Sequence, residues 1–313
     1  MSTIVFIGAV GRSGTTLLER TLATAPRTIA LGEMVHLWDR SVRDGEPCGC
    51  GARFEACPFW SAVGQRAYGG WERVALDQLA DDRRVVDRNR YIPFLIAPRL
   101  APTRFREART RLLDVLDRLY EAIDDVASEA QPGVVLFDSS KHPSYLFLLR
   151  GLTSHRLHLL HVVRDPRGVA NSWARQVTRP EAGNDMEQLG TTRAIVRWTS
   201  HNLLLQLAGR LGVPRRRLSY EHFTRDPLEL GRTVDELLSD DHPPAPAALD
   251  LAIDGHTVTL GVDHTVSGNP MRFRTGAVEI SSDESWRSTM PRRRQMMIGT
   301  LTSPLRQLYA ADN

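Results

Sequence analysis

The chain of 313 residues predicts an α/β fold with three layers, in which helices cover both faces of a central, mostly parallel β-sheet. Two observations predict this fold. Short apolar runs, which are typical of buried strands, alternate along the chain with segments that have the 3.6-residue period of helices. Polar residues also gather repeatedly where a predicted strand ends and a helix begins. The alternation indicates parallel strands joined by crossover helices, and ligands bind at the carboxyl ends of such strands.

The predicted strands are short and apolar, and turn residues or helix starts follow each of them. They lie at residues 4–7, 27–31, 134–137, 157–163 and 217–220. Helices are predicted after the first strand, near Pro143, after Asp165-Pro166 and Asp226-Pro227, and at 74–79, 103–130, 187–212 and 292–309. An Asp before Pro favours a helix start, because Asp caps the first turn and Pro fits the first helical position. Residues 40–72 and 255–285 are predicted to be irregular.

The composition is that of an ordinary soluble protein, with 42% hydrophobic and 25% charged residues. The net charge is only +3, and no block of five or six basic residues is present, so nucleic-acid binding is not predicted. The N-terminal apolar run lacks a basic flank and is too short to cross a membrane, so we expect neither a signal peptide nor a membrane span. A cytoplasmic protein with reduced thiols is therefore predicted.

A glycine-rich loop follows the first predicted strand. It contains Gly8, Gly11 and Gly14, and the helical period begins at Leu17. Backbone N–H groups of such a loop, together with the positive end of the following helix, form an anion site. A guanidinium and three hydroxyl groups are added at the same place by Arg12, Ser13, Thr15 and Thr16. The pattern predicts that residues 11–16 hold a phosphate-like group.

This loop differs from the P-loop of nucleoside triphosphatases, in which the last glycine is followed by lysine and then by serine or threonine. Here Gly14 is followed by Thr15, and the nearest basic residue is Arg12. The predicted fold is therefore P-loop-like, but phosphoryl transfer from ATP is not favoured. A P-loop kinase or NTPase, and a nucleotide-binding module without catalysis, stay as alternatives.

Two motifs resemble the sulfotransferases that use 3′-phosphoadenosine 5′-phosphosulfate (PAPS). The segment R-S-G-T-T-L-L at 12–18 is similar to their 5′-phosphosulfate loop, and V-R-D-P-R-G-V-A-N-S at 163–172 is similar to their 3′-phosphate segment. In the second motif, Arg164 and Ser172 match an arginine and a serine that converge on one phosphate. The chain thus resembles bacterial members of the family and is similar to tyrosylprotein and carbohydrate sulfotransferases.

The resemblance extends over most of the chain and implies a single domain over residues 1–313, with an acceptor-side insertion at about 36–130. It implies that the cofactor is PAPS, which leaves as 3′,5′-adenosine bisphosphate. Within the loop, the implied cofactor contacts are Gly11, Arg12, Ser13, Gly14, Thr15 and Thr16. The segment L-S-Y-E-H-F at 218–223 implies an adenosine contact at Tyr220, and the late loop at 264–273 implies contacts at Ser267, Asn269 and Arg272.

Three residues are candidates for the chemistry of the transfer. Glu33 follows a predicted strand, as does a glutamate that serves as base in tyrosylprotein sulfotransferases. Tyrosylprotein sulfotransferases have a pair of glutamates followed by arginine at this place, whereas this chain has Glu33-Met34-Val35-His36, so a peptidyl tyrosine is not the expected acceptor. His36 is an alternative base, because imidazole titrates near neutrality. Lys141 is the only lysine of the chain. The resemblance places it near the bridging oxygen, where a cation stabilises charge that develops on the leaving phosphate.

Three cysteines, Cys48, Cys50 and Cys57, lie within ten residues. Together with His36 they offer four ligands of the types that zinc prefers, although their spacing is not that of a standard zinc knuckle. A reduced cluster or one disulfide is favoured over a metal, and no metal ligand is predicted.

The favoured function is in-line transfer of a sulfonate group from PAPS to a hydroxyl group of a small-molecule, carbohydrate or lipid acceptor. Residues 34–130 and the region around 175–195 are expected to form the acceptor pocket. Aromatic residues of the first part fit an apolar or sugar-ring surface and fit core packing equally well: Trp38, Phe59, Trp60, Trp71, Tyr91 and Phe94. The acceptor and the choice between a monomer and a homodimer stay open at this point.

Overall fold

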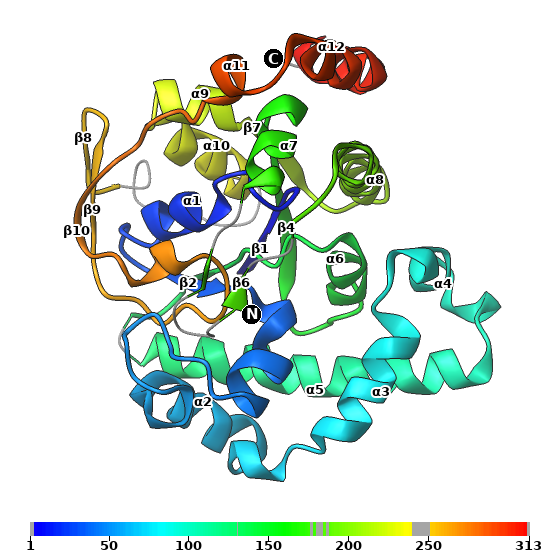
Figure 1. The fold of residues 1–313 in the computed structure, drawn as a ribbon. Coiled ribbons are helices and arrows are strands. Elements are labelled where there is room, and N and C mark those ends of the chain that lie inside the picture. The colour runs from blue at the N-terminus through cyan, green and yellow to red at the C-terminus, as the bar shows by residue number, and fades with distance from the viewer. Residues whose placement is uncertain are drawn as a thin grey trace.

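The structure is a computed structural model that describes residues 3–129, 131–175, 178–179, 184–185, 188–239 and 251–311. Its centre is a parallel sheet of five strands in the order β2-β3-β1-β4-β7 (Figure 1). These strands are β1 (Thr3–Gly8), β2 (Thr28–Gly32), β3 (Val135–Asp138), β4 (Arg156–Val163) and β7 (Arg215–Ser219). Helices cover both faces of the sheet, so the predicted fold class is confirmed.

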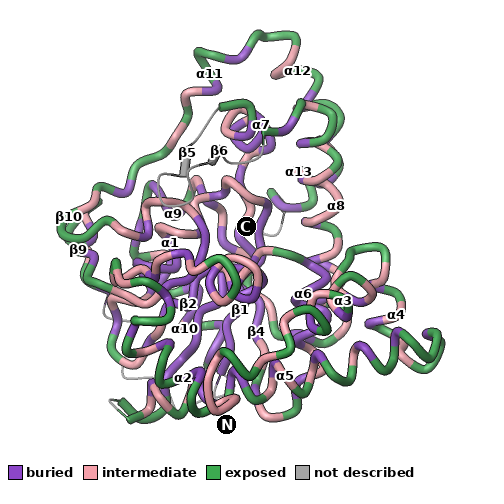
Figure 2. The backbone as a smooth tube through the Cα atoms, turned by 60° about the horizontal axis from the view of Figure 1, so that its bottom comes forward, coloured by how far each residue is buried: buried purple, intermediate pink, exposed green. Residues whose placement is uncertain are grey.

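Strand β1 shows how the two faces are built, because its successive side chains point to opposite sides. Ile4 and Phe6 belong to a core with residues of α5, α6 and α8, whereas Val5 and Ile7 belong to a core with residues of α1 and α10. Figure 2 shows the resulting band of buried strands between the helical layers. The helices are α1 (Thr15–Leu22), α2 (Pro58–Tyr68), α3 (Leu76–Val86), α4 (Ile92–Ile96), α5 (Thr103–Ser128), α6 (Pro143–Leu149), α7 (Pro166–Ala174), α8 (Thr191–Arg210), α9 (Tyr220–Arg225), α10 (Glu229–Leu238), α11 (Trp286–Thr289), α12 (Arg292–Leu301) and α13 (Ser303–Ala311).

The segment that we predict to be an insertion is mostly helical. Helices α2 and α3 pack along the 26-residue helix α5. The prediction that residues 40–72 are irregular is wrong in part, because Pro58 starts α2 at its first helical position and a π-helix covers Leu37–Arg43. Short 3₁₀ turns lie at Met34–His36, Phe54–Ala56, Trp71–Arg73, Asn89–Tyr91, Pro98–Leu100 and Pro270–Phe273. The division of the chain into domains stays a prediction.

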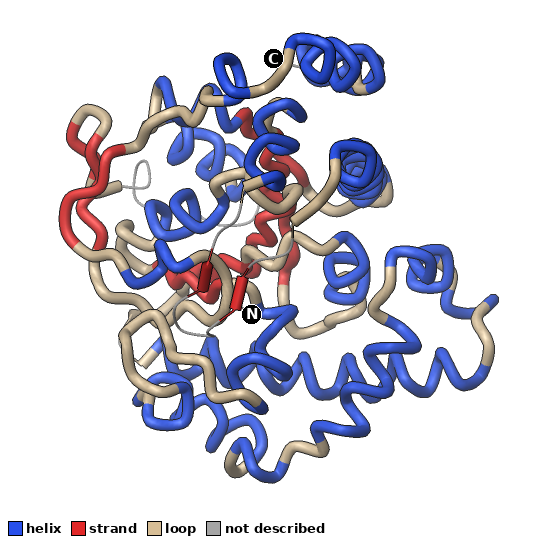
Figure 3. Tube along the Cα trace, viewed as in Figure 1, coloured by secondary structure: helices blue, strands red, loops and turns tan. Residues whose placement is uncertain are grey.

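The region at 255–285 also contains more regular structure than predicted. Strands β8 (Ile253–Asp254), β9 (Thr257–Leu260) and β10 (Gly276–Glu279) form a second, antiparallel sheet (Figure 3). Alternate residues of β9, Val258 and Leu260, are buried in the core on the α1 side of the main sheet. A further short pair joins β5 (Thr178–Arg179) to β6 (Asn184–Asp185). The predicted last helix is divided into α12 and α13, and no helix of the described residues is long and apolar enough to cross a membrane.

Arg20 ties helix α1 to the segment between β9 and β10. Its side chain is buried, and its guanidinium donates to the carbonyl oxygens of Gly261 at 2.7 Å and Met271 at 2.9 Å. The same guanidinium pairs with the carboxylate of Asp263. Breaking a buried ion pair on one side leaves an uncompensated charge. The placement of the late loop therefore depends on this side chain.

Replacing Arg20 by alanine should lower the free energy of unfolding by about 3–5 kcal/mol, because Asp263 would lose its cationic partner. Arg232→Ala is the matched control. The pair of Arg232 with Asp226 is about half exposed, and such pairs contribute little to stability. Urea unfolding of both variants measures the difference. If Arg20→Ala lowered the free energy of unfolding no more than Arg232→Ala does, the proposed role of Arg20 in holding the late loop would be contradicted.

Candidate active site

The loop between β1 and α1 leaves the first turn of the helix open. Gly14, the residue before α1, has a φ of 74°, in the left-handed region that glycine adopts readily. A Cβ at Gly14 would lie 2.7 Å from a ring carbon of Tyr220, so the approach of that ring also requires glycine. No side chain caps α1, and its first turn has no acidic residue. The first N–H groups of α1 are therefore free to bind an anion.

A cavity of about 610 Å³ adjoins this loop at the carboxyl ends of β1, β2 and β3. It brings together nine of the residues predicted from the sequence: Gly11, Arg12, Gly14, Thr15, Thr16, Glu33, His36, Lys141 and Asn269. Trp173, His142 and His201 also line it, together with a polar group formed by Arg40, Asp87, Arg88, Asn89 and Arg197. None of these additional residues is predicted as a site residue from the sequence.

Lys141 connects the anion loop to Glu33. Its Nζ donates to Glu33 Oε1 at 2.6 Å and to Thr15 Oγ1 at 3.3 Å. Burial has the largest single effect and would raise the pKa of Glu33, but the charge and hydrogen bond of Lys141, together with the charges of His36 and Arg40, outweigh it and lower the pKa to about 2. Glu33 is thus ionised and paired near neutral pH.

Three predicted site residues have a backbone conformation that is uncommon outside glycine. The φ angle is 72° at Arg12, 67° at Lys141 and 54° at Ser267, and among the described residues only Arg27 shares this property without being glycine. Such conformations cost free energy and occur often at functional sites. Their concentration here agrees with the assignment of the site.

Three histidines lie in a row beside Glu33. His36 Nε2 is 3.6 Å from Glu33 Oε2, the ring centroids of His36 and His142 are 5.6 Å apart, and those of His142 and His201 are 6.5 Å apart. Burial lowers the pKa of His36 and of His201 to about 3, and it also lowers the pKa of His142. All three imidazoles are therefore neutral near pH 7, and a neutral imidazole can accept a proton.

Arg12 and Ser13 carry buried polar atoms that have no hydrogen-bond partner within the described ranges. These atoms are Nε and Nη2 of Arg12 and Oγ of Ser13. The Arg12 guanidinium lies 5.5 Å from the ring of Trp173, and the ring nitrogen of Trp173 donates to Gly11 O at 3.1 Å. Buried polar groups are normally paired. The unpaired donors of Arg12 and Ser13 thus fit a loop that binds an anion.

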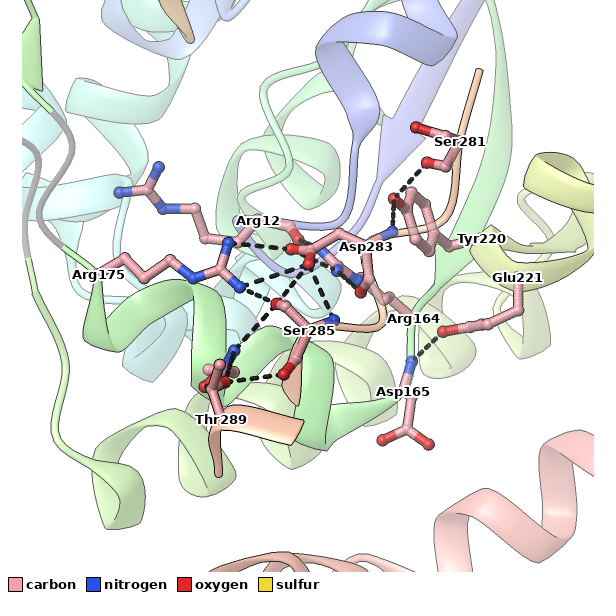
Figure 4. Close-up of polar contacts among 11 residues, drawn as sticks. Arg12, Arg164, Asp165, Arg175, Tyr220, Glu221, Ser281, Asp283, Ser285 and Thr289 are labelled. Carbon is pink, nitrogen blue, oxygen red and sulfur yellow. Dashed lines mark hydrogen bonds and ion pairs between the residues drawn. The ribbon is translucent and has the colours of Figure 1, made fainter. Parts of the chain in front are cut away.

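Arg164 lies on the other side of the loop, and Figure 4 shows its surroundings. Its guanidinium donates to Arg12 O at 2.7 Å and to Asp283 O at 2.8 Å, and it pairs with the carboxylate of Asp283 at 3.3 Å. The ring of Tyr220 packs on the guanidinium at 4.4 Å. Two residues predicted separately from the sequence, Arg164 and Tyr220, are thus in contact, with Asp283 beside them. Figure 4 also shows that the Arg12 guanidinium points away from this group.

Arg164 lines a second cavity, of about 430 Å³, rather than the one that contains Glu33. Ser172 lies in α7 with a half-buried side chain and lines neither cavity. Of the two residues predicted to hold the 3′-phosphate, only Arg164 therefore lines a cavity, and its hydrogen bond to Arg12 O links that cavity to the anion loop.

The late loop closes over Glu33 through main-chain contacts. Glu33 N donates to Val266 O at 2.9 Å, and a Cβ at Gly268 would lie 3.1 Å from Glu33 Oε1. Asn269 lines the cavity, and its side chain caps the turn Pro270–Phe273. Ser267 and Arg272 are buried and do not line the cavity.

Arg272 holds the late loop to the inserted segment. Its Nη1 donates to Pro47 O at 2.7 Å and to Thr265 O at 3.1 Å. In this structure Arg272 therefore stabilises the late loop, and its contact with a nucleotide stays a prediction.

Two buried carboxyl groups, those of Glu19 and Asp138, form hydrogen bonds with residues next to the site. Nothing in their sequence context distinguishes them from ordinary helix and strand residues. Glu19 in α1 accepts hydrogen bonds from Gly32 N at 2.7 Å and from Ser139 Oγ at 2.6 Å. Asp138 at the end of β3 accepts from Ser140 N at 2.8 Å. These bonds fix the residues next to Glu33 and Lys141. Burial raises the pKa of Glu19 to about 8 and that of Asp138 to about 6.

The fold and the site define an α/β protein with a glycine-rich loop at the carboxyl end of its first strand and with ionisable side chains beside that loop. The sulfotransferase family model matches residues 5–238, well over half of the chain. The chain therefore belongs to the sulfotransferase family.

Two solved structures are distantly similar to this chain. The sulfotransferase domain from the curacin biosynthetic pathway is 16% identical, with a TM-score of 0.48 over 97% of this chain and 98% of that domain. The sulfotransferase STF9 from Mycobacterium avium is 16% identical, with a TM-score of 0.40 over 78% of this chain and 64% of that protein. No curated protein matches the chain in sequence.

Glu19→Gln should change how stability depends on pH. The pKa of Glu19 is about 8 in the folded protein and 4.5 for an unperturbed glutamate, so the folded state keeps a proton that the unfolded chain loses. The free energy of unfolding of the wild type should therefore fall as pH rises from about 4.5 to about 8, by up to about 1.4 kcal/mol per pH unit from this group. Glutamine keeps the contacts and removes the titration.

Urea unfolding at pH 5.5 and pH 7.5 measures this difference. The wild type and the control Glu236→Gln, whose side chain is exposed, should lose more stability between the two values than Glu19→Gln. Equal losses in all three proteins would show that Glu19 is ionised in the folded state.

Proposed function

We propose that this protein transfers the sulfonate group of PAPS to a hydroxyl group of an acceptor. The observation that carries the proposal is the position of Lys141, which contacts both Thr15 of the anion loop and Glu33. A cation for the leaving phosphate and a base for the acceptor thus adjoin the same loop. Membership of the sulfotransferase family supports this proposal.

The chain has suitable groups for each charged part of PAPS, which would supply the activated sulfonate. The first N–H groups of α1, together with Arg12, Ser13, Thr15 and Thr16, would hold the 5′-phosphosulfate. Arg164 and Ser172 would hold the 3′-phosphate, and Tyr220 would contact the adenosine. The unpaired donors of Arg12 and Ser13 fit this assignment. At Arg164 a phosphate would have to replace the carboxylate of Asp283.

In the proposed reaction the acceptor oxygen bonds to sulfur while the bond from sulfur to the phosphate oxygen breaks. The proton of the acceptor hydroxyl would pass to Glu33 or His36. Negative charge would grow on the leaving phosphate, where Lys141 would stabilise it more in the transition state than in the ground state.

Glu33 and His36 differ in what each needs to act as the base. While Glu33 is paired with Lys141, its pKa of about 2 makes it a weak proton acceptor. If the ammonium group turned to a bound donor, burial would dominate and the pKa of Glu33 would rise. His36 is neutral near pH 7, but its pKa of about 3 makes it a weak proton acceptor as well. The two residues stay alternatives until their variants are compared.

The acceptor side of the cavity favours a polar acceptor, such as a carbohydrate or an anionic small molecule, over a lipid chain. Its lining includes Arg40, Arg88 and Asn89. The aromatic residues of the inserted segment do not line this cavity: Trp38 and Trp71 pack on each other, and Trp60 is fully buried. Part of the region around 175–195 lies outside the described residues. A cytoplasmic location, one domain over residues 1–313 and a monomer or homodimer belong to the same proposal.

Binding of 3′,5′-adenosine bisphosphate tests the donor. This nucleotide should raise the Tm by more than ATP with Mg²⁺ or AMP does at the same concentration, because only a ligand of the folded state stabilises it. Arg12→Ala should abolish the shift and Arg232→Ala should keep it. Mass spectrometry of an acceptor panel incubated with labelled PAPS should then detect a sulfonated product. Magnesium-dependent ATP turnover would favour the kinase or NTPase alternative, and binding without transfer to any acceptor would favour a non-catalytic module.

Glu33→Gln should lower kcat by about 10²–10⁴-fold, which is the usual contribution of a general base. Its affinity for 3′,5′-adenosine bisphosphate should stay within about threefold of the wild type, and Glu236→Gln should change neither quantity. His36→Asn is compared in the same assay, and the variant with the larger loss identifies the base. Turnover of Glu33→Gln at the wild-type rate would remove Glu33 from the mechanism.

A further inference from the structure

The three cysteines meet His264 of the late loop and not the cavity residue His36. Cys57 Sγ lies 3.5 Å from Cys48 Sγ, 3.8 Å from Cys50 Sγ and 3.3 Å from His264 Nδ1. Cys48 Sγ lies 3.6 Å from the same nitrogen. All four ligand atoms are within 4.8 Å of one another. Three thiols and one imidazole nitrogen therefore surround a single point.

These separations are those of a tetrahedral zinc site. With Zn–S bonds of ~2.3 Å and Zn–N bonds of ~2.0–2.1 Å, the edges of a tetrahedron are about 3.8 Å between sulfur atoms and about 3.6 Å between sulfur and nitrogen. The four contacts above agree with these edges to within a few tenths of an ångström. We propose that Cys48, Cys50, Cys57 and His264 bind one zinc ion.

The backbone around the thiols is shaped to hold them together. Cys48 N donates to Ala52 O, and Gly51 N donates to Cys48 O, both at 2.8 Å, which makes a tight turn that carries Cys48 and Cys50. Gly51 has a φ of 85°, which this turn requires. Cys57 is the residue before α2. The tight turn thus places the thiols of Cys48 and Cys50 close to each other, and the start of α2 places Cys57 beside them.

The fourth ligand is fixed by two aromatic side chains. Trp60 Nε1 donates to His264 O at 2.7 Å, and the ring of Phe59 stacks on the His264 ring at 5.1 Å with an angle of 12°. These contacts orient the imidazole so that Nδ1 faces the thiols.

The site is structural rather than catalytic, because four protein ligands fill a tetrahedral zinc ion and leave no open position for water or substrate. Cys48 and Cys57 are buried and Cys50 is half-buried. Binding of Zn²⁺ would release the proton of each thiol that becomes a thiolate. A disulfide would join only two of the sulfur atoms and would leave the third thiol and His264 without this role.

The ion would join the inserted segment to the loop that closes over Glu33. Two residues after His264, Val266 accepts from Glu33 N and donates to Leu31 O at 2.9 Å. Gly268 then lies against the Glu33 carboxylate. Zinc would therefore help to hold the late loop in place over Glu33, although it would not contact a reacting atom.

Metal analysis of the full chain, purified under reducing conditions without chelator, tests the proposal. The wild type should contain one zinc ion per chain, and His264→Ala and Cys50→Ser should contain at most about a tenth of that amount. His222→Ala is the matched control, because His222 is exposed and outside the cluster; it should keep its zinc. Cobalt loaded in place of zinc should give the visible absorption of a tetrahedral site with thiolate ligands, which Cys50→Ser should weaken.

Further outcomes decide the case if a variant fails to fold. For the wild type alone, a chelator should remove the zinc and lower the Tm, and added Zn²⁺ should restore both. A wild-type protein without metal after growth with added zinc would overturn the proposal, whether its thiols are free or mass spectrometry finds the 2 Da loss of a disulfide. Iron alone at the site would overturn the assignment to zinc. None of these measurements depends on PAPS, so failure of the proposed sulfonate transfer would leave the zinc result intact.

Discussion

The ion pair between Lys141 and Glu33 depends on the register of three neighbouring strands. β1, β3 and β2 are adjacent and parallel, so the residues that follow them emerge at one edge of the sheet. The anion loop follows β1, Lys141 follows β3 and Glu33 follows β2. Glu19 then bonds to Gly32 and Ser139, which precede the two charged residues. The pair is thus held by the sheet and by a buried carboxyl group, rather than by its own attraction alone.

The two halves of the proposed nucleotide site are in different states. At the end near Lys141, the donors of Arg12 and Ser13 are buried without a partner in the described structure, which leaves them ready for an anion. At the other end Arg164 is already paired with Asp283. A 3′-phosphate would therefore compete with a carboxylate of the chain itself. The electrostatic gain at that end is smaller than a free arginine would provide, and most of the binding free energy should come from the loop.

The sequence predicted local chemistry well and long-range packing poorly. The cap of α7 is a local feature, and the side chain of Asp165 accepts from Arg167 N as predicted. The need for glycine at position 14 likewise follows from its positive φ angle, and the nearby ring of Tyr220 adds to it. Glu19 could not be found in this way, because a glutamate in an amphipathic helix is ordinarily exposed. His264 is more than 200 residues from the thiols that it meets, so His36 was the wrong fourth residue for the cluster. No local sequence pattern predicts the contacts of Glu19 with Gly32 and Ser139, or the contact of His264 with the cysteines.

The late loop shows why these unpredicted contacts matter for the site. It has little regular structure of its own, since the turn Pro270–Phe273 is its one described helical element. Separate side chains hold it instead: Arg20 from α1 binds the carbonyl oxygens of Gly261, before the loop, and of Met271, within it, and Arg272 donates to Pro47 O. The cysteine cluster adds an anchor at His264. A loop that is fixed at several points can close over Glu33 without contributing a catalytic group. The side chains of Lys141 and Glu33 are only 12% and 13% exposed, and low exposure strengthens the electrostatic interaction between them.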